Sequence, residues 1–324
     1  MSTPKMVDVF SDIERETALT GNPSGYAVTE LAAKDSRILT LTADLSNTLA
    51  EFRDKFPGRY VELGIAETNS VSIAAGLATC GYVPYIFSMS PFGVLKTAEQ
   101  LRTDVDYNHL PVRLVGRLSG LAMGYFGTSH YAVEDIAIAR TLNNTTVVAP
   151  ADALSAVALF KATASREEPV YLRIAEQVPP VYDGEPSYAH GKWPRLRAGG
   201  DLTLLGHGLG VSLALQAAGI LKDEHGIEAD VFDAAYLKPY DEAALAESAA
   251  KTHRVLAVED HSVVGGLGTI VAETLAARQI PAQLGHAALP AEDLEVGVPA
   301  ELYEYYGLTV AGVIEKALEL TGER

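Results

Sequence analysis

The sequence predicts an α/β protein made of two doubly wound domains, each with a largely parallel β-sheet covered by helices. Three observations support this fold class. Apolar segments of strand length alternate with amphipathic segments of helix length along most of the chain. A segment rich in proline and glycine, residues 177–200, interrupts this alternation once. The length of 324 residues is also comfortable for two domains.

The strands expected in the first domain are short runs rich in β-branched or aromatic residues. They lie at residues 37–42, 60–63, 84–87, 112–115, 146–149 and 170–173. Helical patterns separate most of them, and two examples are residues 47–56 and residues 67–80. Cys80, the single cysteine, ends the second of these patterns, so we expect a small buried residue and no intramolecular disulfide.

The second domain follows a linker. Prolines prevent a continuous helix there, and Gly199-Gly200 ends it. A second α/β unit then begins, with strands expected at residues 201–205, 229–232 and 255–258. We place the first domain at residues 1–190 and the second at residues 191–324, which are typical domain sizes.

The composition argues against several classes of function. The net charge is −17 and no cluster of Lys and Arg is present, so we expect neither nucleic acid nor an anionic membrane as a partner. No apolar run reaches the roughly twenty residues of a membrane-spanning helix. Residues 1–15 lack the apolar run of a secretory signal. We therefore expect a soluble, cytoplasmic protein.

The most informative motif is Glu62-Leu-Gly-Ile-Ala-Glu67. The preceding strand ends at Leu63, Gly64 permits a tight turn, and Glu67 begins a helix rich in small residues. Taken alone, this arrangement requires no function, because the helix dipole stabilises any carboxylate in the first turn.

Together with this helix, the motif resembles the pyrimidine-binding domain of transketolases and of deoxyxylulose-phosphate synthase. In that superfamily the glutamate forms a hydrogen bond with a pyrimidine nitrogen of thiamine diphosphate. The resemblance therefore implies that Glu67 binds this cofactor and is catalytic. Such chemistry requires a carboxyl group in a dry pocket, where a hydrogen bond to nitrogen is strong.

Further cofactor positions follow from the same resemblance. Residues 87–102 are similar to the aromatic stretch of the family that leads into a helix. Phe92 falls where the family places the ring that stacks on the aminopyrimidine, and Met89 and Leu95 fall at the other positions of that pocket.

An Ala-Asp-Leu run resembles another cofactor contact of the family. Asp44 and Leu45 fall at the residues beside the thiazolium ring, and Ser46 falls at a serine that contacts substrate.

A glycine-rich loop carries the second expected catalytic residue. Residues 120–135 resemble the loop of the family and its "G-x-T-H-Q-x-x-E-D" continuation, which places His130 at the histidine. The resemblance implies that His130 stabilises the substrate oxygen or exchanges a proton with it.

Later in the chain, residues 147–152 match the "V-x-x-P-A-D" strand end of the family, and residues 258–268 resemble its C-terminal "E-x-H-x-x-x-G-G-L-G". We interpret the second segment as structural rather than as a dinucleotide site. Neither it nor residues 206–210 contain G-x-G-x-x-G after a first strand.

The diphosphate-binding half of the family is missing from the sequence. No Gly-Asp-Gly is present to hold a divalent metal against the phosphates, so we expect no metal ligands in this chain. The resemblance implies that an N-terminal type of transketolase subunit supplies this half and holds Mg²⁺ or Ca²⁺. The expected assembly is a heterotetramer of two copies of each chain.

The substrate positions depart from the transketolase pattern. Leu118 stands at a histidine, Tyr125-Phe126 replaces an acidic pair, Tyr131 replaces a glutamine, and Glu176 replaces a phosphate-binding arginine. We expect a more apolar pocket in which Glu176 repels a phosphate dianion.

A relocated cation could still bind a donor phosphate, and Arg113 and Arg117 are the candidates. The expected reaction is transfer of a two-carbon ketol or acyl unit to an acceptor other than an ordinary aldose phosphate. One alternative is the β subunit of a 2-oxo acid dehydrogenase decarboxylating component. Another is a non-catalytic subunit, which the joint presence of Glu67, Phe92 and His130 disfavours.

Overall fold

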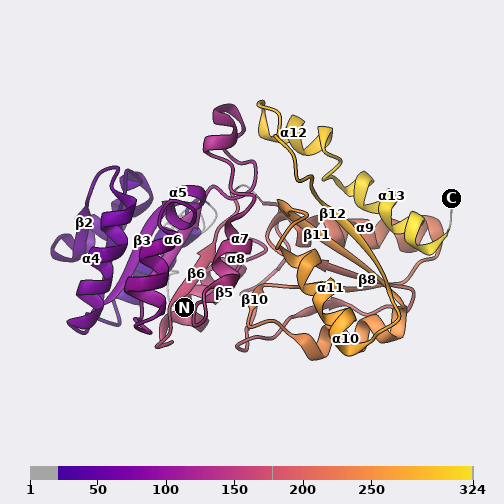
Figure 1. Ribbon diagram of the computed structural model, residues 1–324, viewed down its shortest axis with the longest axis horizontal. Coiled ribbons are helices and arrows are strands. Elements are labelled where there is room, and N and C mark those ends of the chain that lie inside the picture. Colours follow the sequence, from indigo (N-terminus) through magenta and orange to yellow (C-terminus); the bar gives the residue numbers. More distant parts are fainter. Residues whose placement is uncertain (1–20, 177, 323–324) are drawn as a thin grey trace, which may run out of the picture.

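The computed structural model describes residues 21–176 and 178–322 and consists of two α/β domains that lie side by side along the long axis (Figure 1). This arrangement confirms the predicted fold class. The segment at residues 1–15, on which the expectation about targeting depends, lies outside the described residues. So does residue 177, the first position of the predicted linker.

The first sheet contains seven strands in the described part of the chain, in the order β10-β5-β6-β4-β3-β1-β2. All neighbours are parallel except β10, which pairs antiparallel with β5. Every strand expected in the first domain is present. The strands are β1 (Ile38–Thr42), β2 (Tyr60–Glu62), β3 (Val83–Met89), β4 (Arg113–Arg117), β5 (Thr146–Val148), β6 (Val170–Arg173) and β10 (Tyr236–Lys238).

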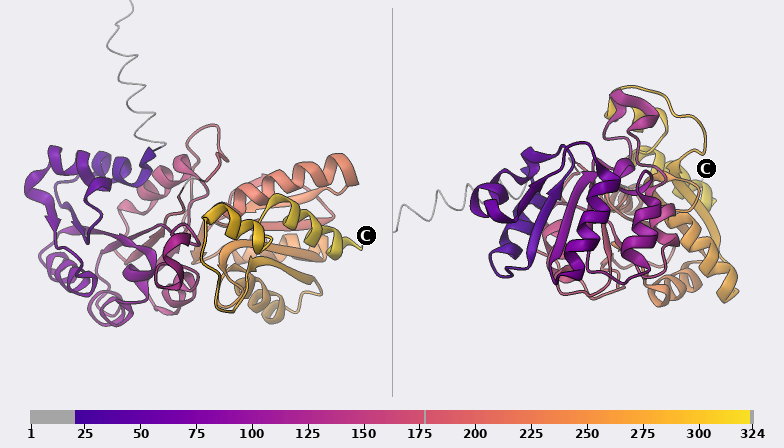
Figure 2. Two further views of the ribbon diagram at one scale, coloured as in Figure 1. Left: turned by 90° about the horizontal axis from the view of Figure 1, so that it is seen from above. Right: turned by 60° about the vertical axis from the view of Figure 1, so that its left-hand side comes forward.

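Helices cover both faces of this sheet, as Figure 2 shows. The α-helices are α2 (Pro23–Ala32), α3 (Ala50–Lys55), α4 (Glu67–Thr79), α5 (Ser90–Val94), α6 (Ala98–Gln100), α7 (Asp135–Thr141) and α8 (Ala153–Ala164). Shorter turns are the 3₁₀ segments η1 (Ser46–Leu49), η2 (Pro57–Arg59) and η4 (Gly124–Ser129) and the π-helix η3 (Leu101–Asp106). The helix expected at residues 47–56 is divided between η1 and α3.

The second sheet has five strands among the described residues, in the order β12-β11-β8-β9-β7, and only β7 is antiparallel to its neighbour. Its strands are β7 (Arg195–Arg197), β8 (Leu202–Gly206), β9 (Ala229–Asp233), β11 (Arg254–Ser262) and β12 (Gln283–Leu289). The helices of this domain are α9 (Leu209–His225), α10 (Glu242–Thr252), α11 (Leu267–Arg278), α12 (Pro299–Tyr305) and α13 (Val310–Thr321).

The two domains are joined through a shared core. Strand β10 comes from the second half of the chain and forms the edge of the first sheet. Phe232, Tyr236 and Leu237 pack in the same apolar cluster as Val148 and Phe160 of the first domain. Burial of this continuous apolar surface holds the domains against each other.

One local expectation is wrong. Cys80 is exposed rather than buried, because α4 ends at Thr79 and the chain turns at the surface there. Among the described residues, no helix combines the length and apolar character needed to cross a membrane.

Candidate active site

The candidate site residues gather because they follow parallel strands. Asp44 follows β1, Glu67 follows β2, Phe92 follows β3, Leu118 follows β4 and Glu176 follows β6. The carboxyl ends of parallel strands meet at one edge of a sheet, which is where open α/β sheets bind ligands. The topology thus brings residues from distant parts of the sequence to one edge.

Glu67 is the first residue of α4 and only 5% exposed. Its Oε2 accepts a hydrogen bond from Lys96 Nζ at 2.7 Å, and the Lys96 side chain is 47% exposed. The turn before it is open to solvent. Gly64 has φ of 65°, a Cβ added there would have no neighbour within 4 Å, and Ile65 is 74% exposed. The Glu67 carboxylate is therefore buried next to a turn that is open to solvent. The partner that the structure identifies for it is Lys96, whose side chain is flexible enough to move.

An aromatic cluster lies at the same edge. The rings of Phe92 and His130 meet edge to face with centroids 5.0 Å apart, and Phe126 stacks on His130 at 4.7 Å. Ser129 Oγ lies 2.8 Å from His130 Nδ1. The structure thus brings together a residue expected to bind cofactor with two expected to contact substrate, and it fixes the plane of the imidazole.

The turn after β1 is organised by Glu62, which the sequence did not single out for function. Glu62 Oε1 accepts hydrogen bonds from the backbone N–H groups of Asp44 at 3.3 Å and Gly64 at 2.9 Å. Tyr60 donates to Glu62 Oε2 at 3.0 Å, and burial together with this bond raises the pKa of Tyr60 to about 12. Asp44 has φ of 62°, a conformation that is costly for a residue with a Cβ.

Leu45 and Ser46 continue from this turn. Leu45 donates its N–H to Thr42 Oγ1 at 3.0 Å, and Ser46 begins η1. Met89 ends β3 and Leu95 follows α5, so both flank Phe92 in the chain, and each is partly exposed.

The charge of Glu176 is balanced. Arg117 Nε donates to Glu176 Oε1 at 2.8 Å, and Arg117 also donates to Thr48 Oγ1. Both charged side chains are mostly buried, at 14% and 20% exposure. We expected Glu176 to repel a phosphate dianion, and the structure adds that Arg117 neutralises its charge. The next residue, Leu118, has φ of 58°.

Two other expectations about side chains fail. Arg113 is fully buried at the start of β4 and donates to the carbonyls of Thr163 and Glu168, so it cannot serve the carboxyl edge. Tyr131 adds no ring to the pocket. It is 3% exposed and donates to the carbonyl oxygens of Gly124 and Glu295, which attaches η4 to the segment before α12.

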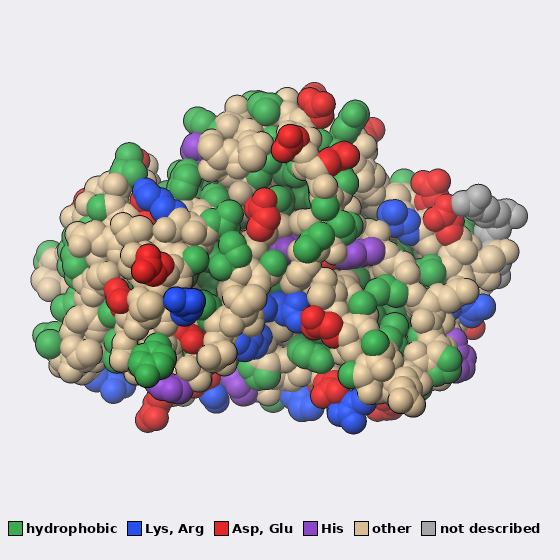
Figure 3. All heavy atoms as spheres, in the orientation of Figure 1, with side chains coloured by type: hydrophobic (Ala, Val, Ile, Leu, Met, Phe, Trp, Pro, Cys, Tyr) green, Lys and Arg blue, Asp and Glu red, His purple; other side chains and the backbone are tan. Residues whose placement is uncertain are grey.

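A cavity of about 590 Å³ lies between the domains beside these residues; we call it the interdomain cavity. It is lined by Leu118, Ser119, Ala122, Tyr125, Ala175, Glu176, Val178, Pro179, Leu209, Asp260, Val298, Pro299, Ala300 and Tyr303. The lobe formed by η4 and α12 borders it, and this lobe projects above the rest of the surface in Figure 3. The volume is typical of small-molecule sites.

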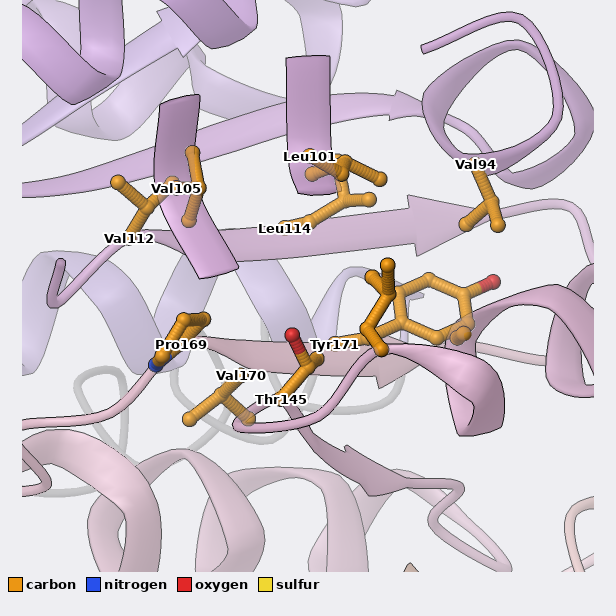
Figure 4. A pocket seen from close by; sticks show the side chains of 11 residues that line it. Val94, Leu101, Val105, Val112, Leu114, Thr145, Pro169, Val170 and Tyr171 are labelled. Atoms are coloured by element: carbon orange, nitrogen blue, oxygen red, sulfur yellow. The ribbon is translucent and has the colours of Figure 1, made fainter. Parts of the chain in front are cut away.

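A second pocket lies in the core of the first domain. Its walls are apolar side chains of β4, β6 and η3, including Leu101, Leu114 and Val170 (Figure 4). Its volume of about 10 Å³ has room for no more than about one water molecule, so we interpret it as a packing gap.

A buried ionic cluster fixes the interface behind the site. Arg173 at the end of β6 pairs with Asp135 at 2.9 Å and with Asp260 of the second domain at 2.6 Å. Burial alone would lower the pKa of Arg173, but the two carboxylates outweigh it and raise that pKa. Tyr171 also donates to Asp135, at 2.6 Å.

The glycine-rich segment of the second domain has a structural geometry. Glu259 is fully buried and accepts the backbone N–H groups of Leu267 and Gly268 at the start of α11. His286 and His207 lie 2.7 and 3.2 Å from its oxygens. A Cβ on Gly268 would lie 2.3 Å from the His286 ring, so these glycines serve close packing. Within the described ranges, no group of three or more His, Cys, Asp or Glu could hold a metal ion.

Comparison with known proteins bears on both domains. The family model described as transketolase, pyrimidine binding domain matches residues 17–180, and that described as transketolase, C-terminal domain matches residues 191–313. The chain is 37% identical to a subunit of the apulose-4-phosphate transketolase of Phocaeicola vulgatus, over 90% of this chain and 93% of that protein.

Two further similarities follow the same pattern. The 6-deoxy-6-sulfo-D-fructose transketolase subunit SqwH of Clostridium sp. is 36% identical over 90% of this chain and 91% of its own. A solved structure described as a split gene transketolase, inactive beta4 tetramer superposes with a TM-score of 0.86 at 35% identity, over 93% of this chain and 98% of that one.

Proposed function

Since the chain belongs to the transketolase family, with its pyrimidine-binding and C-terminal domains, we propose that it acts with a separate partner subunit as a thiamine-diphosphate-dependent transferase. The transferred group is a two-carbon ketol unit. The observation that carries this proposal is Glu67, a buried carboxylate at the carboxyl edge of the first sheet, beside an open turn. The family relationship confirms the resemblance that the sequence suggested.

The residues at this edge fit the cofactor. Glu67 would receive its pyrimidine ring, with Phe92, Met89 and Leu95 as the surrounding apolar side chains and Asp44 and Leu45 beside the thiazolium. When bound, thiamine diphosphate supplies the electron sink that allows carbon–carbon bonds beside a carbonyl to break and form. The open turn at Gly64, where a Cβ would meet no atom within 4 Å, supports access at this edge.

Two side chains of this chain, Glu67 and His130, would take part in the reaction. Glu67 holds a hydrogen bond at its carboxyl oxygen, and its present partner Lys96 is exposed enough to move away. His130 is engaged by Ser129 at Nδ1, so Nε2 is the nitrogen that would exchange a proton with a substrate oxygen. Phe92 meets the imidazole edge to face and Phe126 stacks on it, and these contacts hold the ring in position.

We place the diphosphate and its Mg²⁺ or Ca²⁺ in the partner subunit. The similarity to chains named as transketolase subunits supports a split enzyme. A related solved structure, described as an inactive beta4 tetramer of a split gene transketolase, supports activity only after the partner binds. A heterotetramer with two chains of each kind remains our proposal for the assembly.

The acceptor in this proposal is not an ordinary aldose phosphate. The two relatives are named for a sugar phosphate and a sulfonated sugar, which supports sugar chemistry. In this chain, however, Leu118 provides no charge and Arg117 is already neutralised by Glu176. An anionic end would therefore have to displace a partly buried ion pair.

The test is a comparison of two first-turn glutamates in the chain combined with its partner subunit. Glu67→Gln should lower kcat by about 10²- to 10⁴-fold, the range for losing an acid–base group. Glu242→Gln is the matched control, because Glu242 also begins a helix and pairs with one cation, Arg278, but lies 40% exposed on the surface. Unchanged turnover in Glu67→Gln would identify the chain as a non-catalytic subunit.

A further inference from the structure

The interdomain cavity extends the candidate site into the second domain. It starts at Leu118 and Glu176, which follow two strands of the first sheet, and reaches Asp260 and Tyr303 of the second domain. Its described lining residues come from both domains of this chain. Its volume of about 590 Å³ is sufficient for a sugar-sized molecule.

One polar group in this cavity lacks a partner. Ser119 is 1% exposed and lines the cavity, and its Oγ has no hydrogen-bond partner among the described residues. The backbone there is satisfied, since Ser119 N–H donates to Ile174 O and Gly120 N–H donates to Ala132 O. A buried hydroxyl without a partner is unfavourable, so a ligand hydroxyl that bonds to it would gain free energy.

The residues on both sides of this serine have a left-handed backbone conformation. Leu118 has φ of 58°, which is costly for a residue with a Cβ, and Gly120 has φ of 62°, which glycine adopts without strain. A Cβ at Gly120 would lie 2.3 Å from Asp260 Oδ2 and 2.6 Å from Tyr303 Oη, so only glycine allows these oxygens to approach so closely. Ser119, Asp260 and Tyr303 line the cavity, so this turn brings residues with a hydroxyl, a carboxylate and a phenol together at its wall.

The charges around the cavity are balanced. Its lining includes the carboxylates of Glu176 and Asp260 but no Lys, Arg or His among the described residues. Arg117 pairs with the first carboxylate at 2.8 Å and Arg173 with the second at 2.6 Å. An anionic group would find no unpaired cation here, whereas uncharged hydroxyls can donate to carboxylate oxygens and accept from Ser119.

The geometry assigns this cavity to the uncharged, hydroxyl-bearing end of the sugar substrate, with Ser119 as the residue that recognises a hydroxyl. This assignment rests on the proposed function, because it gives the substrate class of the same site. The assignment also gives a role to the second domain, which is far from Glu67 in sequence and contributes Asp260 and Tyr303 to the wall of the interdomain cavity.

Binding to the full chain tests the assignment, with D-ribose and D-ribose 5-phosphate as probes and ligand-observed NMR as the readout. We expect D-ribose to bind more tightly than its phosphate ester. Ser119→Ala should weaken D-ribose binding about tenfold, as loss of one hydrogen bond to a neutral group does. The control is Thr40→Val, which removes another buried unpartnered hydroxyl, in β1, away from the cavity lining, and should leave binding unchanged.

A second variant separates loss of fold from loss of the site. Ala122→Leu fills the cavity from another wall and should also abolish D-ribose binding, while circular dichroism shows an unchanged fold. Tighter binding of the phosphate ester, or equal D-ribose binding by Ser119→Ala and wild type, would overturn the assignment. Glu67→Gln should retain D-ribose binding. Failure of the proposed function would therefore appear as unchanged turnover in that variant, independently of the cavity result.

Discussion

Each domain places a buried glutamate beside the N-terminus of a helix, at the carboxyl edge of its sheet, and the two differ in how fully they are bonded. Glu259 is fully buried and accepts bonds from two backbone N–H groups, with His207 and His286 beside it. Glu67 accepts one bond that the structure identifies, from the half-exposed Lys96.

The difference separates structure from function. A carboxylate whose oxygens are all occupied by fixed donors stabilises the fold and has no capacity for another partner. A buried carboxylate with one mobile partner can exchange that partner for a ligand. The contrast agrees with the proposal that the two glycine-containing motifs have different roles, although both place an acid near a helix N-terminus.

The largest expected effect is on stability, from Glu259. Glu259→Leu leaves two histidines and two backbone donors without their buried acceptor, so it should lower the free energy of unfolding by about 3–5 kcal/mol. Urea unfolding monitored by circular dichroism measures this change. Glu67→Leu is the matched variant and should cost much less, since its partner can return to water. Equal losses would remove the distinction between the two acids.

The next effect depends on pH and involves Asp233, at the end of β9. Burial raises the pKa of Asp233 to about 6, although hydrogen bonds from Tyr188 and Tyr182 oppose this shift. A raised carboxyl pKa contributes stability below the unfolded value of 3.8, and this contribution is lost as pH rises through about 6. A shift of this size corresponds to about 3 kcal/mol.

Glu259 has the opposite sign. Burial would raise the pKa of Glu259, but hydrogen bonds from His207 and His286 lower it well below 4.5, so its contribution is present above pH 4.5 and lost in acid. We expect Asp233→Asn to abolish the loss of stability between about pH 4 and 7 and to leave the loss of stability in acid unchanged. Unfolding curves measured across this pH range report both losses. If Asp233→Asn still lost stability between about pH 4 and 7, the assignment to Asp233 would be contradicted.

A smaller effect concerns the ion pair at the edge of the active site. Glu176→Gln removes the partner that neutralises Arg117, and the freed guanidinium should attract a phosphate. We expect affinity for D-ribose 5-phosphate to rise about tenfold, the gain from one charge-assisted hydrogen bond. Isothermal titration calorimetry measures it. Glu168→Gln is the control, because Glu168 pairs with Arg166 away from this edge and its loss should leave phosphate binding unaffected.

The strands that carry the site could be predicted from sequence because each is a local run of β-branched or aromatic residues. Strand β12 could not be predicted in this way, because Gln283–Leu289 contains no β-branched residue, Phe, Tyr or Trp. It is a strand because it pairs with β11. Strand β10 could not be predicted either, because its three residues complete the sheet of the other domain, a contact that no local pattern encodes.

The partners of the charged residues could not be predicted for the same reason. Arg117 and Glu176 lie 59 positions apart, and Glu67 and Lys96 lie 29 apart, so their pairing follows from the order of strands in the sheet. Motif resemblance assigned Glu67, Phe92 and His130 to one candidate site from sequence alone. The ion pairs that set the charge of that edge, and the second-domain wall of the cavity, depend on tertiary packing.

The smallest expected effect concerns the ion pair between Lys96 and Glu67, and it tests how much free energy this pair contributes to stability. The ammonium group belongs to a side chain that is 47% exposed, so water competes for it and the pair should contribute less than about 1 kcal/mol. Lys96→Met should therefore leave the free energy of unfolding nearly unchanged, and a double-mutant cycle with Glu67→Gln should give a similarly small coupling.

A coupling of several kcal/mol would mean that Lys96 locks Glu67 as firmly as the histidines hold Glu259. The Lys55–Glu51 pair on α3 is the control, since Lys55 is 52% exposed and represents an ordinary surface pair. If the two couplings agree, the Glu67 carboxylate is free to change partners at little cost. That freedom is the property that a cofactor-binding acid needs and that a helix-capping acid such as Glu259 lacks.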